Sequence, residues 1–221
     1  MDIMVGSGVN HCKLDNRTSL NLGRLHLSVP IGEKVIRYAY IRKNGCSAFK
    51  SALGYPPETE ISEIKRKHGC RWKRYDATIF VWRDPEERLV SLYRNKIIDG
   101  VNNEEIMRKY ERYCEGDIYD FEKFVEFSIL DLDPHCLPQS SHLRPIVYTH
   151  AIPLKRLYQA MVEIVGREAA QPFARSVNAS RPTPVDVTEK ARRMIRQHYS
   201  RDYKLIARLA DKQVAGNTLG V

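Results

Sequence analysis

The chain has 221 residues, enough for one ordinary domain with a full hydrophobic core. Its content of 43% hydrophobic and 29% charged residues excludes a disordered or fibrous protein. The 36 basic residues outnumber the 27 acidic ones, giving a formal net charge of +9. This excess favours anionic partners such as nucleotides, charged glycans, nucleic acid or an anionic membrane surface.

Cysteine usage and hydropathy bear on location. The five cysteines are widely spaced and form no Cys-x-x-Cys pair, so we expect reduced thiols with no disulfide framework and no zinc site. The N-terminus shows no charged region followed by an apolar run, and no segment approaches the roughly 20 apolar residues of a membrane span. We therefore expect a cytoplasmic protein without a transmembrane segment.

The N-terminal part of the chain divides into an arm and the start of a single domain. Residues 1–30 are polar and weakly periodic, which predicts a loosely packed arm with a short hairpin near Leu20–Val29. The remaining residues, 31–221, contain no linker or repeat and are expected to form one domain. Lys34–Ile41 has the β-branched and aromatic residues of a buried strand, and a helix is expected over Ser47–Leu53.

A second strand followed by a helix comes next. The charged residues 58–75 include a basic run that is typical of a solvated helix face. Ala77–Trp82 predicts a strand that ends immediately before a helix start signal. Asp84 is suited to cap that helix, Pro85 to its first position, and Glu87 to completing a capping box.

The rest of the chain is mainly helical. Helices are expected over 103–130, with a break near Gly116, over Pro153–Val165 and over Thr188–Val214, with a short strand at Pro145–Tyr148. The repeated order of strand, turn and helix predicts an α/β fold with a central parallel sheet flanked by helices. In such folds ligands bind at the carboxyl ends of the strands. The turn after each of the first two predicted strands lies at such an end.

The first of these turns carries residues suited to an anion. It runs from Arg42 through Lys43 and Gly45 to Ser47, where the next helix begins. Free backbone N–H groups and the helix dipole favour an anion there, and Lys43 adds a positive charge. The turn lacks the G-x-x-x-x-G-K-[ST] signature of nucleotide triphosphatases, because its lysine precedes the small residues.

The second turn offers a guanidinium and a hydroxyl. Arg83 follows the strand end directly, and Ser91 lies two turns into the following helix, with Arg94 near the same side. An arginine and a hydroxyl in this arrangement can both donate hydrogen bonds to one phosphate group.

The two turns together resemble the sulfate-donor site of a known enzyme family. YAYIRKNGCSAFKSAL resembles the 5′-phosphosulfate loop of membrane-type carbohydrate sulfotransferases, and IFVWRDPEERLVSLYRNKI is similar to their 3′-phosphate element. Asp133–Gln139 resembles the His-Trp-x-Pro-Gln loop of that family, Val177–Arg181 its Asn-x-Ser loop, and Tyr199–Tyr203 its C-terminal Tyr-x-x-Asp helix. Two departures are Arg42 in place of a proline and Cys136 in place of the tryptophan. The short chain without an anchor looks like a bacterial member.

This resemblance implies a three-layer, P-loop-like fold and PAPS (3′-phosphoadenosine 5′-phosphosulfate) as co-substrate, with no metal. Arg83 and Ser91 would hold the 3′-phosphate, and Lys43 would also stabilise charge on the leaving 5′-phosphate. The residues implied in holding the 5′-phosphosulfate are Lys43, Asn44, Gly45, Cys46, Ser47 and Ala48.

A hydroxyl acceptor needs a general base to take its proton. Of the seven histidines, His135 stands out through its loop, and it is the expected base. His142, Glu115, Asp117 and Asp120 are the alternatives.

The acceptor and the reaction class stay open at this point. A carbohydrate hydroxyl is the acceptor that the resemblance implies, and a small-molecule metabolite is the alternative. A nucleotide kinase or triphosphatase would share the phosphate-binding fold, and a non-enzymatic module binding RNA or glycans would share the basic charge. The expected partners are an anionic nucleotide and an acceptor, with no nucleic acid.

Overall fold

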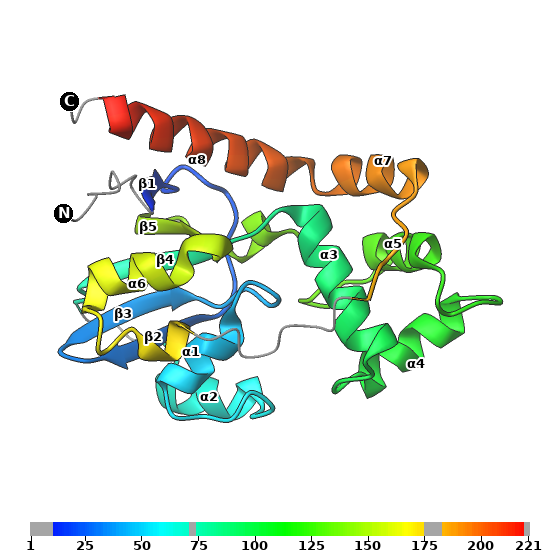
Figure 1. The fold of residues 1–221 in the computed structure, drawn as a ribbon, viewed down its shortest axis with the longest axis horizontal. Helices are drawn as coiled ribbons and strands as arrows, with labels where there is room; N and C mark the ends of the chain where they lie inside the picture. Colours follow the sequence, from blue (N-terminus) through cyan, green and yellow to red (C-terminus); the bar gives the residue numbers. More distant parts are fainter. Residues whose placement is uncertain (1–10, 71–73, 175–182, 219–221) are drawn as a thin grey trace, which may run out of the picture.

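The computed structural model describes residues 11–70, 74–174 and 183–218 of the chain. They form a five-stranded sheet in the order β1-β5-β4-β3-β2, with helices on both faces (Figure 1). The strands are β1 (Cys12–Asp15), β2 (His26–Ile31), β3 (Lys34–Ala39), β4 (Ala77–Trp82) and β5 (Val147–Pro153). The three central strands are parallel, whereas β1 and β2 pair antiparallel at the two edges.

The helices connect and cover these strands. The α-helices are α1 (Cys46–Ala52), α2 (Ile61–His68), α3 (Pro85–Tyr93), α4 (Glu104–Tyr113), α5 (Phe121–Leu130), α6 (Leu157–Val165), α7 (Glu189–His198) and α8 (Ser200–Thr218). A π-helical turn, η1 (Arg94–Ile98), continues α3, and the 3₁₀ turns are η2 (Gln139–His142), η3 (Leu154–Arg156) and η4 (Gln171–Phe173).

Alternating side chains of the sheet build two cores. From β4, Ile79 and Val81 pack with α1, α2 and α6 on one face, while Phe80 packs on the other face. There Leu205 and Leu209 of α8 cover the sheet. This alternation is the period of two expected of a strand buried on both faces. The expected α/β fold with a central sheet flanked by helices is therefore confirmed, with two antiparallel edges in addition.

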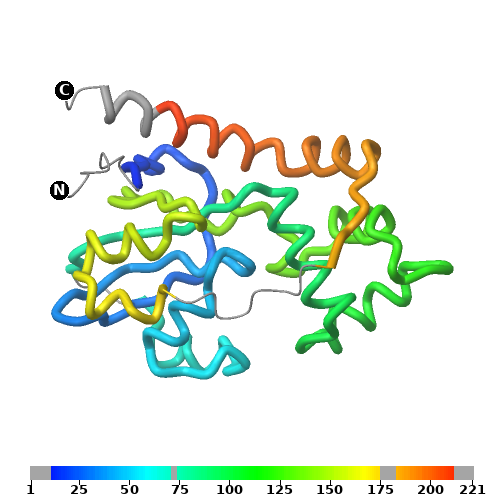
Figure 2. Tube along the Cα trace, in the orientation of Figure 1, coloured from blue at the N-terminus to red at the C-terminus, as the bar shows by residue number. Residues whose placement is uncertain are grey.

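A third core lies beside the sheet. It joins α3, α4, α5 and α7 around Tyr110 and Phe124, whose rings meet nearly edge to face at 5.4 Å. The break expected near Gly116 falls between α4 and α5, and Thr188 caps α7 through a hydrogen bond from the backbone N–H of Ala191. In Figure 2, α7 and α8 follow one another along the same side of the molecule.

The structure corrects the expectation for the N-terminal arm. Cys12–Asp15 and His26–Ile31 form the two opposite edges of the sheet, and the segment between them crosses from one edge to the other (Figure 2). β2 pairs with β3, so the hairpin expected near Leu20–Val29 is wrong. The sequence pattern did not indicate this strand, because the polar residues His26 and Ser28 stand at positions that tertiary contacts bury.

Candidate functional site

A cavity of about 1170 Å³ opens where β3 and β4 end. Its walls come from the loop after β3, from α1, α3 and η1, from the loop after α5, and from η3 and α6. Four acidic residues line it, against seven basic ones: Arg42, Lys43, Lys50, Arg83, Arg94, Lys96 and Lys155. This surplus of positive charge suits an anionic ligand.

The loop from Arg42 to Ala48 forms one wall. Lys43 has a φ of 67° and Gly45 a φ of 76°, so two residues of this short turn adopt the left-handed conformation. For lysine that conformation costs on the order of 1 kcal/mol, and such strain gathers at binding sites. A Cβ at Gly45 would lie 2.9 Å from Cδ1 of Leu154 in η3 and 3.0 Å from Cδ2 of Leu157 in α6, so only glycine lets these elements approach the loop this closely.

Lys43 is half-buried at the cavity wall, and its ammonium makes no hydrogen bond with the described residues. Burial lowers the pKa of Lys43 to about 8, and the nearby charges of Lys96 and Arg83 lower it further against the opposite effect of Cys46. A bound anion would reverse this shift by favouring the charged ammonium. Gly45, Cys46, Ser47 and Ala48 line the same cavity, as expected.

Asn44 is the exception among the residues expected at the donor. Its side chain is fully buried and does not line the cavity. Its Nδ2 donates to the carbonyl oxygen of Val81 (2.8 Å) and to Oε1 of Gln139 (2.5 Å). Asn44 therefore fixes the loop to β4 from behind, and its amide is not available to a ligand.

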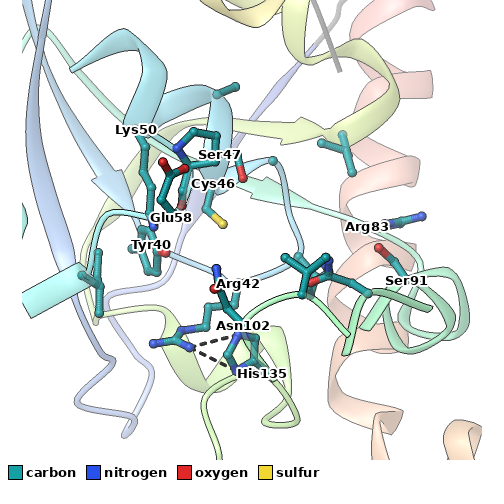
Figure 3. Close-up of a pocket in the computed structure, with 18 of the residues that line it drawn as sticks. Tyr40, Arg42, Cys46, Ser47, Lys50, Glu58, Arg83, Ser91, Asn102 and His135 are labelled. Atoms are coloured by element: carbon teal, nitrogen blue, oxygen red, sulfur yellow. Dashed lines mark hydrogen bonds between the residues drawn. The ribbon is translucent and has the colours of Figure 1, made fainter. Parts of the chain in front are cut away.

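Arg83 and Ser91 lie together on the side of the cavity opposite Ser47 and Lys50 (Figure 3). Arg83 is placed by its own backbone: its N–H donates to Oε1 of Gln139 at 3.0 Å, and its carbonyl accepts from Nε2 at 2.8 Å. Burial lowers the pKa of Arg83, partly offset by Glu87. Arg83 and Ser91 thus occupy one wall of the cationic cavity.

The helix that carries Ser91 begins as expected, with one difference. Oδ1 of Asp84 accepts a hydrogen bond from the N–H of Glu87 (3.1 Å), and Pro85 occupies the first turn. The Glu87 carboxylate does not close a capping box. It lies 2.7 Å from Nζ of Lys155 and 3.6 Å from Nε of Arg83, because η3 brings a second cation to this corner.

The sequence-based hypothesis assigns no ligand to five of the cavity cations: Arg42, Lys50, Arg94, Lys96 and Lys155. Lys50 and Lys96 donate to loop carbonyls, Lys96 to those of Val101 and Asn102 at 2.9 and 2.5 Å. Nε of Arg94 is buried without a hydrogen-bond partner, which leaves an unsatisfied donor beside the cavity. Helical spacing placed Arg94 near the side of Ser91, whereas Lys96 lies in the π-helical turn η1, where that spacing no longer holds.

His135 lies on the cavity wall beside two charged side chains. Its Nδ1 is 2.6 Å from Oδ1 of Asp133, which also accepts the backbone N–H of His135. Nη1 of Arg42 lies 2.9 Å from Nε2 and 3.1 Å from Nδ1 of the same ring, as Figure 3 shows. Asp133 fixes the tautomer with a proton on Nδ1, so Nε2 is the accepting nitrogen. In this structure the Nε2 lone pair accepts a hydrogen bond from Nη1 of Arg42, which an acceptor hydroxyl would have to displace.

The charges around His135 set its protonation. Burial lowers the pKa of His135 to about 4; the hydrogen bond with Asp133 raises it, and the charges of Arg42 and Lys96 lower it. Burial alone would raise the pKa of Asp133, but its hydrogen bonds from His135 outweigh this and hold the pKa well below its usual value. The imidazole is therefore neutral at physiological pH and can accept a proton.

The reserve candidates for the base do not line this cavity. His142 is buried behind the loop, which lowers its pKa to about 3. Asp120 accepts the N–H groups of Glu122 and Lys123 as the cap of α5, and Glu115 and Asp117 lie in the preceding loop. These four residues lack contact with the cavity that holds Lys43, whereas His135 lines it.

A buried network of hydrogen bonds links the C-terminal helices to the loop that carries His135 and Gln139. Asp202 of α8 is fully buried and accepts the backbone N–H groups of Gln139 (2.7 Å) and Ser140 (2.8 Å). The hydroxyl of Tyr199 donates to the carbonyl oxygen of Cys136 at 2.5 Å. Through Gln139 the C-terminal helix is linked to Arg83. The Asn-x-Ser segment, residues 177–181, lies outside the described residues.

Two features of the described residues bear on cofactors and membranes. No group of three or more His, Cys, Asp or Glu side chains in this part of the chain is placed to hold a metal ion. None of the described helices combines the length and the apolar character needed to cross a bilayer.

The fold and the site define a class: an α/β protein with a cationic cavity at the carboxyl ends of its parallel strands, the place where such folds bind ligands. A model of the sulfotransferase family matches residues 31–206, so the chain belongs to the sulfotransferase family. No curated protein and no solved structure matches the chain significantly. A bacterial source and a cytoplasmic location stay predictions.

Proposed function

We propose that this chain transfers a sulfuryl group from PAPS to an acceptor hydroxyl, most suitably one on a carbohydrate. Family membership supports sulfuryl transfer in general. The observation that carries the rest is the convergence of three groups on one cavity: Lys43, the Arg83–Ser91 pair, and His135 with Asp133.

The two ends of the donor fit the two cationic walls. Arg83 and Ser91 would bind the 3′-phosphate, and the buried, unsatisfied Nε of Arg94 offers a further donor there. Gly45–Ala48 and Lys43 would bind the 5′-phosphosulfate. A ligand with anionic groups at both ends matches this charge distribution better than a neutral one.

In the chemical step, the acceptor hydroxyl would replace Arg42 at Nε2 of His135, which would take its proton while the acceptor oxygen forms its bond to sulfur. The bond between sulfur and the 5′-phosphate oxygen breaks, and Lys43 would stabilise the charge that develops on that oxygen. The products are the sulfate ester, adenosine 3′,5′-bisphosphate and one proton, carried away by the imidazole. Asp133 would stabilise the imidazolium that forms.

The size of the cavity supports an acceptor larger than a simple alcohol. Its volume of about 1170 Å³ exceeds the roughly 300–1,000 Å³ typical of small-ligand sites. The donor leaves part of that space beside His135, where a sugar could place a hydroxyl. A small-molecule metabolite is the competing acceptor.

A transfer assay with radiolabelled PAPS tests the proposal. A panel of neutral glycans, acidic glycans and small alcohols should reveal label transfer to glycans, and adenosine 3′,5′-bisphosphate should inhibit it. A melting temperature that millimolar adenosine 3′,5′-bisphosphate leaves unchanged would contradict the donor assignment, because a ligand at a hundred times its Kd stabilises by about 2.7 kcal/mol. ATP hydrolysis without use of PAPS would favour a triphosphatase instead.

A further inference from the structure

Arg88 is a buried cation beside the site for which the proposed function gives no role. It lies on α3, three residues before Ser91, and its side chain is 3% exposed. Its guanidinium donates three hydrogen bonds, all to main-chain carbonyls: from Nε to Arg42 (3.2 Å), from Nη1 to Leu137 (2.9 Å) and from Nη2 to His135 (2.9 Å). It forms no ion pair with the described residues.

Burying a charge without a carboxylate partner is costly, so a purely structural role would be met more simply by a neutral side chain. The uncompensated positive charge instead lies beside an anion-binding cavity, where it is one of the charges that lower the pKa of Lys43. Arg88 does not itself line that cavity, so its three hydrogen bonds point to a role in placing the loops around it.

The three carbonyls belong to segments far apart in the sequence. Arg42 begins the loop that holds Lys43, whereas His135 and Leu137 belong to the loop after α5, and no strand pairing joins these segments. Because a guanidinium group is planar and rigid, its hydrogen bonds fix both the distance between these two loops and their relative orientation. Because Arg88 stands on the helix that carries Ser91, it ties both donor-binding elements to the loop of the proposed base.

We propose that Arg88 is a positioning residue that holds His135 in register with the Lys43 loop. This proposal rests on the proposed function. Arg88 does not touch the reacting atoms; it acts through the two loops. Arg42 and Asn44 also contact this loop, through His135 and Gln139. Loss of Arg88 removes the hydrogen bonds to the main chain of the loop, so we expect His135 to shift and turnover to fall while the 3′-phosphate contacts of Arg83 and Ser91 stay in place.

Kinetics of Arg88→Ala and Arg88→Lys test this role. We expect kcat to fall about 100-fold in both variants, the size of effect that a 1 Å misplacement of a reacting group produces. The Kd for adenosine 3′,5′-bisphosphate should change by less than about fivefold, since Arg88 makes no contact with its proposed site. Guanidinium ion at non-denaturing concentration should restore part of the turnover of Arg88→Ala, and none of Arg88→Lys, whose pocket is filled.

The titration of His135 gives a readout that needs no turnover. The groups that face its ring are Asp133 on its own loop, Arg42 on the loop after β3, and Lys96 on η1, while Arg88 holds its carbonyl. Burial is the main cause of the low pKa of His135, and the charge of Arg42 adds to it. A loop released by loss of Arg88 should expose the ring and shift it relative to Arg42, so the pKa of His135, followed by NMR, should rise from about 4 towards its ordinary value.

Arg193→Ala, at an exposed position of α7, is the matched control and should behave like the parent in every assay. An unchanged kcat and an unchanged His135 titration in Arg88→Ala would overturn the proposal. So would a fall in stability, donor affinity and kcat together with no guanidinium rescue, which is the result of a merely structural role. If Arg88→Ala does not fold, Arg88→Lys and Arg88→Gln carry the same test. Absence of transfer by the parent, with normal donor binding and the expected His135 shift, would refute the proposed function alone.

Discussion

Replacing Arg83 by alanine should separate the two ends of the donor. The backbone N–H and carbonyl of Arg83 both bond to Gln139, and alanine retains these groups, so the strand end should keep its conformation. The variant therefore removes the guanidinium alone. Its side chain is 24% exposed, so a contact with a phosphate there would be largely shielded from water.

The expected loss follows from that shielding. A hydrogen bond to a charged group contributes about 1.5–3 kcal/mol. At about 1.4 kcal/mol per tenfold change, Arg83→Ala should weaken adenosine 3′,5′-bisphosphate roughly 10- to 150-fold. Adenosine 5′-monophosphate, which lacks the 3′-phosphate, should lose far less. Isothermal titration calorimetry of both nucleotides on parent and variant measures the difference.

Glu87→Gln is the matched control for the charge at this corner. Oε2 of Glu87 lies 3.6 Å from Nε of Arg83 and would compete with a phosphate for it. Half-exposed ion pairs contribute about 0–1 kcal/mol, so the bisphosphate should bind up to about fivefold more tightly to Glu87→Gln. Equal losses for the two nucleotides in Arg83→Ala would show that this arginine does not contact the 3′-phosphate.

Three further predictions concern protons. Lys43→Arg should abolish the decline in donor affinity above about pH 8, because arginine stays charged where the parent lysine loses its proton; an unchanged alkaline limb would argue against Lys43 as the donor cation. His135→Ala should cut kcat by about 10²–10⁴-fold with donor affinity nearly intact, and Asp133→Asn should cut it less; near-parental turnover of His135→Ala would place the base elsewhere. Burial lowers the pKa of His26 to about 4, so protonation of the unfolded chain should reduce stability as pH falls from about 6.5 to 4, by about 3 kcal/mol. Urea unfolding of His26→Gln should show a shallower acid dependence, and an identical one would contradict this assignment.

Sequence reasoning succeeded where the signal is local. Asp84 and Pro85 start α3 whatever surrounds them, and Ala77–Trp82 is apolar throughout because a central strand is buried on both faces. The positions of Lys43 and Arg83 followed from the same logic, since both lie in turns after strands whose carboxyl ends face the cavity, Arg83 directly after β4 and Lys43 in the loop after β3.

Sequence reasoning failed for the edge strand β2 and for side chains that turn from a loop into the protein interior. β2 has polar residues at buried positions, so its pattern does not alternate as a strand with one wet face would. Asn44 stands among donor-loop residues, yet its side chain turns inward to Gln139, 95 residues further along the chain. Nothing within a short window of sequence encodes such a contact.

The chain's residues alone determined its charge, its two strand–turn–helix units and the chemical character of the groups at their ends, because these depend on neighbours within a few positions. Only the tertiary structure decided that His135 meets Asp133 and Arg42, while His142 is buried away from the cavity. Only the structure, likewise, gave Arg88 its three carbonyls. The physical reason is that burial and long-range hydrogen bonds set the pKa and orientation of each group, and both arise when distant segments pack together.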